Sequence, residues 1–258
     1  MSSADTFKLG GEVELARLGL GTNRIEDDDD SRAILPAALD HGVNLIDTAD
    51  IYTGGTSERV IGQTIGADPR AHIATKGGYR GAEPEKIAAA IDASRERLGL
   101  ETIDLYYLHK PHPDIAIEQS VDPIVSARQD GRVRHVGLSN VTLDQIDRVR
   151  RLTPVAAVQN VYNLENTENE DVIDYCERHE IMFVPYFPLR GGERAQAIAD
   201  RLGATRQQVI LAAMLARSPV VVPIPGTRNV KHLETNLASQ QLTISAADLD
   251  ELGLGSRE

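Results

Sequence analysis

The stretch Asn44–Tyr52, NLIDTADIY, contains the pattern from which the fold can be argued: an apolar, strand-like run ends on the carboxylate of Asp47, and Tyr52 follows five residues later. A buried strand that ends on an ionisable residue is unusual, because burying a charge without a partner costs on the order of several kcal/mol. The pattern therefore predicts that Asp47 either has a cationic partner or lies at a strand tip that faces a cleft.

On both sides of this stretch, two kinds of segment alternate along the chain. Short apolar runs predict strands at Ala16–Gly21, Val43–Asp47, Ala71–Lys76, Ile103–His109, Val133–Ser139, Ala156–Val161, Ile181–Tyr186 and Val220–Ile224. Apolar residues at helical spacing predict helices at Ala33–His41, Glu58–Ile65, Pro84–Leu98, Ile117–Asp130, Thr142–Arg151, Asn169–Glu180, Arg206–Ala216 and Asn229–Ala238. Ser31, Ser57 and Thr142 are the predicted start signals of the first, second and fifth helices, because side-chain oxygens cap free backbone N–H groups.

The alternation predicts parallel strands, and the nearly continuous apolar runs predict a sheet buried on both faces. Eight such units most economically close a (β/α)8 TIM barrel, so residues 1–258 are predicted to be a single α/β barrel domain. An open doubly wound sheet is the competing fold, but no Gly-x-Gly-x-x-Gly follows the first strand. The predicted additions to the barrel are an N-terminal β-hairpin (Thr6–Leu9 and Glu12–Leu15), a helix near Arg194–Leu202 and a final helix at Ala246–Leu252.

The composition limits the partners and the location of the chain. The formal net charge is −12, with 22 Arg and 5 Lys, and an acidic surface disfavours nucleic acid or an anionic membrane as the main partner. We interpret the acidity as a source of solubility; a high-salt cytoplasm would favour the same composition. No apolar run is long enough to predict a transmembrane helix. The one cysteine, Cys176, excludes an internal disulfide and indicates a reducing, cytoplasmic location.

In a barrel of parallel strands, the carboxyl ends of the strands form the reactive face. The residues at these predicted ends are Gly21, Thr22 and Asn23; Asp47; Lys76; His109; Ser139 and Asn140; Gln159 and Asn160; Tyr186; and Pro225, Gly226 and Thr227. Polar groups are therefore predicted to converge on one mouth of the barrel.

Four residues near these ends can form a proton-transfer site. Asp47 and Lys76 end adjacent strands, so Lys76 is the predicted partner of Asp47; taken alone, the two would equally fit a structural ion pair. Tyr52 is predicted to lie against the Lys76 ammonium, and a nearby cation lowers the pKa of a tyrosine from about 10 by favouring the phenolate. Such a tyrosine can give or take a proton near neutral pH. His109 is placed to donate a hydrogen bond to a substrate oxygen.

A metal site is not predicted. His109 and His112 have a metal-like spacing, but Pro111 and Pro113 break any helix that would present both on one face, and no third ligand clusters nearby. A metal-dependent hydrolase on a barrel would need a His-x-His at an early strand tip, and the sequence has none there.

Seven motifs occur in order along the chain: DTADIY at 47–52, Ser57-Glu58, Thr75-Lys76, Leu108-His109, GLSN at 137–140, Gln159-Asn160 and IPGT at 224–227. Together they resemble the aldo-keto reductase family, and the resemblance covers nearly the whole chain. It implies NADPH-dependent reduction of a small-molecule aldehyde or ketone, or the reverse oxidation of an alcohol. The family has no Rossmann fingerprint, in agreement with the missing glycine motif.

The resemblance also implies a role for each site residue. The implied catalytic residues are Tyr52, Lys76, Asp47 and His109. Tyr52 would be the general acid, Lys76 and Asp47 would tune its acidity, and His109 would orient the substrate carbonyl. Ser139, Asn140 and Gln159 would hold the nicotinamide carboxamide, and Tyr186 would stack on the ring. The full set that it assigns to the cofactor is Gly21, Thr22, Asn23, Asp47, Ser139, Asn140, Gln159, Tyr186, Phe187, Pro188, Leu189, Ile224, Gly226, Thr227, Arg228 and Asn236.

The sequence differs from the commoner family pattern in the regions expected to bind the substrate and the cofactor. It ends at Glu258 without the long loop that often covers the substrate, and the connection Lys110–Ala116 is short, so an open site is expected. Gly226 and His232 occupy positions at which many members of the family have basic residues that bind the 2′-phosphate of NADPH. Arg228 is the remaining candidate, since a guanidinium suits phosphate, and NADPH is favoured over NADH.

A second class of function shares the same fold and residues. A non-catalytic or weakly catalytic cofactor-binding regulatory subunit, of the kind associated with channels, is the alternative. No long basic or apolar extension supports a membrane partner for such a subunit. We expect a monomer or a weak homo-oligomer.

Overall fold

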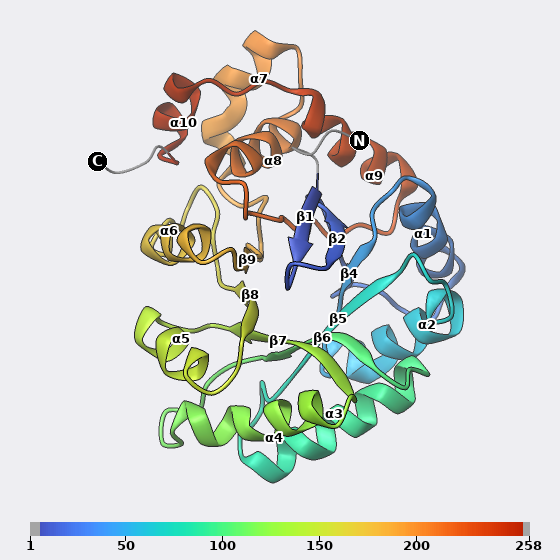
Figure 1. Ribbon diagram of the computed structural model, residues 1–258. Helices are drawn as coiled ribbons and strands as arrows, with labels where there is room; N and C mark the ends of the chain where they lie inside the picture. The colour runs from blue at the N-terminus through green and yellow to red at the C-terminus, as the bar shows by residue number, and fades with distance from the viewer. Residues whose placement is uncertain (1–5, 255–258) are drawn as a thin grey trace.

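The structure is a computed structural model that describes residues 6–254. Figure 1 shows strands surrounded by helices, with the β1–β2 hairpin near the centre of the view. The strands are β1 Thr6–Leu9, β2 Val13–Ala16, β3 Leu20–Gly21, β4 Leu45–Asp47, β5 His72–Gly77, β6 Ile103–Leu108, β7 Val133–Ser139, β8 Val155–Gln159 and β9 Met182–Phe183. The helices are α1 Asp29–Asp40, α2 Thr56–Ile65, α3 Pro84–Leu98, α4 Ile117–Gln129, α5 Leu143–Arg150, α6 Glu170–Arg178, α7 Gln196–Leu202, α8 Arg206–Arg217, α9 Val230–Leu237 and α10 Ala246–Leu252. Short 3-10 helices are η1 Tyr52–Gly55, η2 Gly192–Ala195 and η3 Ala238–Gln241.

In the described part of the chain, seven parallel strands pair in sequence order from β3 to β9. The predicted eighth strand, Val220–Ile224, lies between the two ends of this sheet. Val221 bridges Phe183 of β9, and Gly226, just beyond the segment, bridges Gly21 of β3. These bridges close the sheet into a ring, and the predicted (β/α)8 barrel is confirmed.

The eighth strand makes single bridges because of its prolines. Pro223 and Pro225 have no N–H to donate, so a continuous ladder cannot form there. The remaining bonds still join both neighbours: the Val222 N–H donates to the Phe183 carbonyl at 2.9 Å, and the Gly19 N–H donates to the Pro223 carbonyl at 2.9 Å.

The hairpin covers the amino-terminal end of the barrel. Asn44, which directly precedes β4, accepts a hydrogen bond from the Ala16 N–H and donates one to the Glu14 carbonyl, both at 2.9 Å. Ala16 thus belongs to the hairpin, and β3 is shorter than predicted. Leu9 and Leu15 pack into the barrel interior with Leu45, Ala74, Leu105, Tyr107, Ala156, Ala157, Met182, Val184, Val222 and Ile224. These side chains therefore fill the amino-terminal half of the barrel interior in the described part of the chain.

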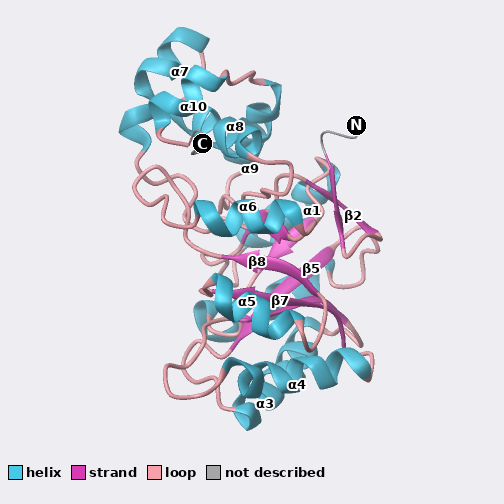
Figure 2. Ribbon diagram, turned by 60° about the vertical axis from the view of Figure 1, so that its left-hand side comes forward, coloured by secondary structure: helices cyan, strands magenta, loops and turns pink. Residues whose placement is uncertain are grey.

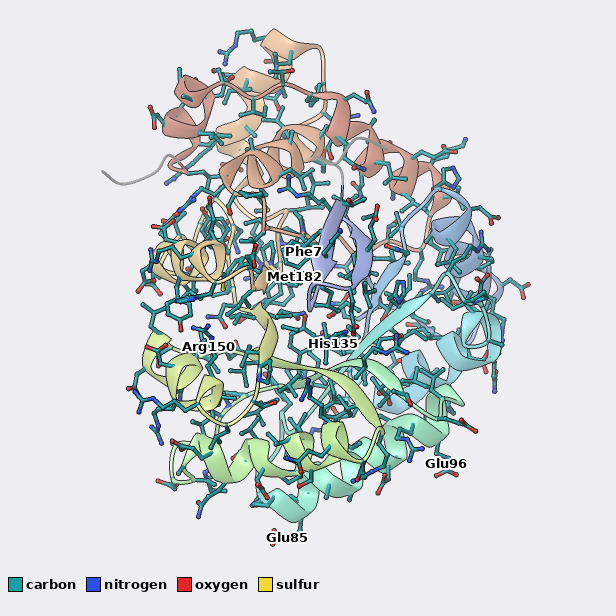
Figure 3. The ribbon with its side chains drawn as sticks, viewed as in Figure 1. Phe7, Glu85, Glu96, His135, Arg150 and Met182 are labelled. Atoms are coloured by element: carbon teal, nitrogen blue, oxygen red, sulfur yellow. The ribbon has the colours of Figure 1, made fainter. Side chains whose placement is uncertain are left out.

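A second apolar cluster fills the layer between the sheet and the helices. The helices lie outside the strands in Figure 2, and their buried apolar faces include Ile34, Ile61, Ile91, Val121 and Ile173. Charged residues take the opposite faces, as Glu85 and Glu96 at the rim of Figure 3 illustrate. Burial of one face per helix explains the 3.6-residue periodicity of the sequence.

One of the three predicted helix starts is confirmed. The Thr142 hydroxyl caps α5 and forms a reciprocal pair of hydrogen bonds with Gln145. The prediction for Ser31 is wrong, because the carboxylate of Asp28 caps α1 by accepting from the Ser31 N–H at 2.9 Å. The prediction for Ser57 is also wrong, since this residue lies inside α2 and its hydroxyl is used elsewhere.

Candidate active site

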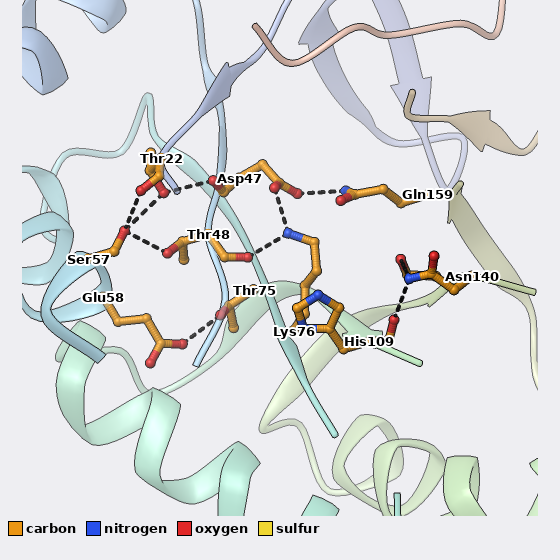
Figure 4. A network of polar contacts seen from close by, with 11 residues as sticks. Thr22, Asp47, Thr48, Ser57, Glu58, Thr75, Lys76, His109, Asn140 and Gln159 are labelled. Atoms are coloured by element: carbon orange, nitrogen blue, oxygen red, sulfur yellow. Dashed lines mark hydrogen bonds and ion pairs between the residues drawn. The ribbon is translucent and has the colours of Figure 1, made fainter. Parts of the chain in front are cut away.

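A buried ion pair lies at the mouth of the barrel (Figure 4). Lys76 Nζ lies 2.5 Å from Asp47 Oδ1 and donates a second hydrogen bond, of 2.7 Å, to the Thr48 carbonyl. Gln159 Nε2 donates to Asp47 Oδ2 at 2.8 Å. Burial disfavours the ammonium, but Asp47 and then Tyr52 favour it, and the pKa of Lys76 is raised overall. Lys76 is thus the predicted cationic partner, and it stays charged.

The ring of Tyr52 lies against this ion pair. Lys76 Nζ is 5.1 Å from the ring centroid, and the imidazole of His109 meets the same ring edge-on at a centroid distance of 6.3 Å. Burial raises the pKa of Tyr52, Lys76 opposes the rise, and Asp47 adds to it, so the pKa lies above its usual 10. The predicted lowering of this pKa is wrong, because the cost of removing the phenolate from water exceeds the attraction of the ammonium.

A tight turn directly follows Tyr52. Thr53, Gly54 and Gly55 have positive φ angles of 47°, 66° and 83°, and glycine adopts such angles without steric cost. The Thr53 hydroxyl donates to the Ile25 carbonyl at 2.9 Å and ties the turn to the loop after β3. The turn therefore fixes the residue that follows Tyr52 to a neighbouring loop of the mouth.

A polar network behind the ion pair holds α2 against the sheet (Figure 4). The Ser57 hydroxyl donates to the Thr22 carbonyl at 3.1 Å. Glu58 accepts from the Thr75 hydroxyl at 2.5 Å and from Arg97 Nε at 2.6 Å. The sequence reasoning missed these contacts, although two adjacent polar residues on the buried face of α2 were the signal that could have revealed them.

His109 is neutral at the mouth. Burial and, after it, the Lys76 ammonium lower its pKa to about 3. A neutral imidazole has one donor and one acceptor nitrogen. His109 Nδ1 has no hydrogen-bond partner within the described residues, and the Tyr79 ring lies 4.9 Å away. The ring can therefore exchange a single hydrogen bond with an oxygen placed beside Tyr52.

Asn140 is hydrogen-bonded to residues at the carboxyl ends of three strands, β6, β7 and β9. Its Nδ2 donates to the His109 carbonyl at 2.9 Å and to Ser139 Oγ at 3.1 Å, and its Oδ1 accepts from the Tyr186 hydroxyl at 2.8 Å. Asn140 has a positive φ of 59°, a conformation that asparagine tolerates better than most residues. The structure thus brings together three of the residues predicted to contact a nicotinamide.

A cleft of about 660 Å³ lies over these residues. The predicted site residues that line it are Gly21, Thr22, Asn23, Asp47, Tyr52, His109, Ser139, Asn140, Gln159, Tyr186, Phe187, Pro188, Leu189, Ile224 and Gly226. The cleft is also lined by Pro225, which was predicted at the mouth but not as a cofactor contact, and by Arg24, Ile51, Tyr79, Lys110 and Arg190, which were not predicted as site residues. All of these except Tyr79 are adjacent in sequence to a predicted residue, but the side on which a loop residue faces cannot be read from a strand pattern.

Three of the predicted cofactor residues lie outside the cleft lining: Thr227, Arg228 and Asn236. Asn236 is buried on α9. Arg228 is bound by two carboxylates, with a close contact to Asp28 and a 3.6 Å contact to Glu26. Its Nε is buried and has no hydrogen-bond partner in the described part of the chain.

Residues 6–254 contain no group of three or more His, Cys, Asp or Glu side chains that could hold a metal ion. In the same range, no helix combines the length and the apolar character needed to cross a membrane. Cys176 is buried, and burial raises the pKa of its thiol to about 12. Cys176 therefore packs as a small residue of the core, with its thiol protonated at neutral pH.

Known proteins match this sequence over nearly the whole chain. A pyridoxine 4-dehydrogenase of Escherichia coli is 33% identical over 99% of this chain and 100% of its own length. An uncharacterized oxidoreductase of Schizosaccharomyces pombe is 35% identical over 98% of this chain and 91% of its own.

The fold has close matches among solved structures. An aldo-keto reductase of Klebsiella pneumoniae, in complex with NADPH, superposes with a TM-score of 0.86 at 28% identity, covering 96% of this chain and 93% of that one. The sequence profile of the Aldo/keto reductase family matches residues 17–195, which contain the ion pair, Tyr52 and His109. The chain belongs to the aldo/keto reductase family of oxidoreductases.

Proposed function

We propose that the protein reduces the carbonyl group of an aldehyde or ketone to the alcohol with NADPH, and catalyses the reverse oxidation with NADP⁺. The observation that carries this proposal is the buried Asp47–Lys76 pair against Tyr52, with neutral His109 at the edge of the same ring. The cleft above them leaves room for a cofactor and a substrate. The NADPH complex of the Klebsiella pneumoniae relative supports the choice of cofactor.

Each of the four residues has a distinct task. NADPH, when bound, supplies the hydride that the carbonyl carbon accepts. Tyr52 gives its hydroxyl proton to the carbonyl oxygen, and the Lys76 ammonium stabilises the phenolate that remains until water returns the proton. His109 donates a hydrogen bond to the same oxygen and fixes its orientation. Asp47 holds Lys76 charged and in place.

The cleft residues fit a nicotinamide dinucleotide. Ser139, Asn140 and Gln159 offer hydroxyl and amide groups that match the donors and acceptors of a carboxamide. Arg24 and Arg190 line the cleft on the two sides of the eighth strand and match the negative charge of a diphosphate. We assign the diphosphate to this side of the mouth, with the adenosine directed toward Arg228.

The carbonyl substrate is best found with a panel. A relative is a pyridoxine 4-dehydrogenase, so the panel should contain pyridoxal together with aliphatic and aromatic aldehydes. We expect NADPH absorbance to fall with at least one of them, and a chelator to leave the rate unchanged, because every step proposed above is carried by side chains and NADPH. Binding of NADPH without turnover of any carbonyl would instead favour a cofactor-binding regulatory subunit.

The Tyr52→Phe substitution tests the assigned general acid. General acid–base assistance is worth about 10²- to 10⁴-fold, so we expect kcat to fall by about 100-fold or more. The NADPH dissociation constant, measured by fluorescence titration, should change by less than about 2-fold, because the phenyl ring keeps its place. Tyr106→Phe is the matched control, since it removes a hydroxyl that has no hydrogen-bond partner among the described residues and lies outside the cleft lining. A Tyr52→Phe enzyme that retains most of its rate would remove Tyr52 from this role.

A further inference from the structure

The cleft differs in charge from the rest of the molecule. The chain has 39 acidic and 27 basic residues, yet within residues 6–254 the only carboxylate that lines the cleft is Asp47. Lys76 neutralises that carboxylate at 2.5 Å. Three further cations, Arg24, Lys110 and Arg190, line the same cleft. A cleft lined by one sign of charge concentrates ligands of the opposite sign.

The order of the strands separates these three cations into two sites. Arg24 follows β3 and Arg190 follows β9, and the bridges of the eighth strand place it between these two strands. Lys110 follows β6, which is three strands from β3 in one direction and three strands from β9 in the other. Lys110 therefore lies across the barrel mouth from the pair of arginines.

The surroundings of Lys110 belong to the reacting end of the cleft. It directly follows His109, whose ring lies 6.3 Å from Tyr52 and 4.9 Å from the half-exposed ring of Tyr79. The side chain of Lys110 is exposed, and no carboxylate of the described residues forms an ion pair with it. Its ammonium is therefore free to meet a ligand beside the proton donor.

We propose that Lys110 binds an anionic group, a carboxylate or a phosphate, carried by the carbonyl substrate. Lys110 is thus a specificity-determining residue, and the preferred substrates are acidic aldehydes or ketones. Tyr79 contacts the part of the substrate that joins the carbonyl to the acidic group. This inference rests on the proposed reductase function, in which the two arginines serve the cofactor phosphates.

The test compares three aldehydes of nearly equal shape: 4-carboxybenzaldehyde, 4-formylphenyl phosphate and the neutral 4-formylbenzamide. Partly exposed ion pairs contribute about 0.2–1 kcal/mol, so Lys110→Gln should lower kcat/KM for the two anionic aldehydes by about 2- to 5-fold, through KM. Lys110→Glu should enlarge this loss, and Lys110→Arg should restore most of it. The preference for the anionic aldehydes over the amide should also weaken with added salt.

The matched control is Lys8→Gln, which removes the same charge from the hairpin at the opposite end of the barrel. It should leave the ratio of anionic to neutral kcat/KM unchanged. An equal loss for all three aldehydes in Lys110→Gln, or an equal change of the ratio in Lys8→Gln, overturns the proposal. A phosphate-only or carboxylate-only effect supports it and identifies the group.

Calorimetric titration of 4-(hydroxymethyl)benzoate into the NADP⁺-bound protein measures the same contact without turnover. We expect the dissociation constant to rise in Lys110→Gln and not in Lys8→Gln. If the wild type reduces no aldehyde, the reductase function fails, while this titration still decides whether Lys110 binds the anion. An identical dissociation constant in wild type and Lys110→Gln removes Lys110 from the role.

Discussion

Burial sets the protonation states of Tyr52 and His109 more than any single neighbour does. The lysine beside both of them opposes the shift of the tyrosine and reinforces the shift of the histidine. The result is a protonated phenol beside a neutral imidazole. Both are the states that the reduction of a carbonyl needs, because the phenol must give a proton and the imidazole must donate a hydrogen bond without charge.

These shifts predict the pH dependence of the reaction. A tyrosine with a raised pKa loses its proton only in alkaline solution, so the rate of carbonyl reduction should fall only above about pH 10. A histidine with a pKa lowered to about 3 gains charge only in strong acid, so His109 should not titrate near the ordinary histidine pKa of about 6.5. Burial raises the pKa of Asp50 to about 6, so we expect kcat for reduction to be flat between about pH 7 and 9 at constant ionic strength. An inflection between pH 6 and 7 that persists in Asp50→Asn would contradict the neutral His109.

At the level of elements, an ion pair between Asp28 and Arg228 joins the start of α1 to the loop before α9. Asp28 caps α1, and Arg228 lies in the loop before α9; the two are 200 residues apart in the chain. The hydrogen bonds from Ser31 and the contact with Arg228 lower the pKa of Asp28, so this carboxylate is ionised at neutral pH. An arriving 2′-phosphate would have to replace Asp28 and Glu26 at the guanidinium.

Two substitutions are therefore expected to change the affinity for NADPH in opposite directions. Arg228→Ala should weaken NADPH by about 10-fold or more, since a hydrogen bond to a charged group contributes about 1.5–3 kcal/mol, and should leave NADH unchanged. Asp28→Asn should tighten NADPH, because it frees the guanidinium and removes a like charge, while asparagine still caps α1. Fluorescence titration with both cofactors measures each effect. Weaker NADPH binding in Asp28→Asn would show instead that Asp28 positions Arg228.

Closure of the ring is a property of the whole molecule, and it depends on close contact between β3 and the eighth strand. A Cβ atom at Gly21 would lie 2.7 Å from the Ile224 carbonyl oxygen. The same seam lines the cleft through Gly21, Ile224 and Gly226. Barrel closure and the shape of the cleft are therefore linked.

Gly21→Ala tests this link. Forcing an extra methyl group into a packed contact costs about 1–3 kcal/mol, so we expect the free energy of unfolding to fall by about this amount in urea titrations. The affinity for NADPH should fall in the same variant. Gly192→Ala is the control, because its Cβ would meet its nearest neighbour, Ile210 Cδ1, at an ordinary 3.4 Å. Equal stability of the two variants would contradict a tight seam.

The sequence alone determined the barrel and the meeting of Asp47, Lys76 and His109. Parallel strands put their carboxyl ends on one face, so three residues that end strands must come together whatever their distance in the chain. The alternation of apolar runs and helical segments was sufficient to predict this meeting. The spacing of apolar residues in each segment shows whether it is a strand or a helix and which of its sides is buried. The position of the residues predicted to bind the cofactor, at the ends of β7 and β8 and after β9, followed in the same way.

Only the tertiary structure decided the remaining features, because they depend on groups distant in sequence. The direction of the Tyr52 pKa shift depends on how much water the packed barrel removes, and spacing along the chain does not report this. Asp28 takes the cap predicted for Ser31 and holds Arg228, which comes near only when the ring closes. Likewise, Lys110 lies opposite the two arginines only because the barrel is closed. The order of residues along the chain does not report which of them face each other across the mouth.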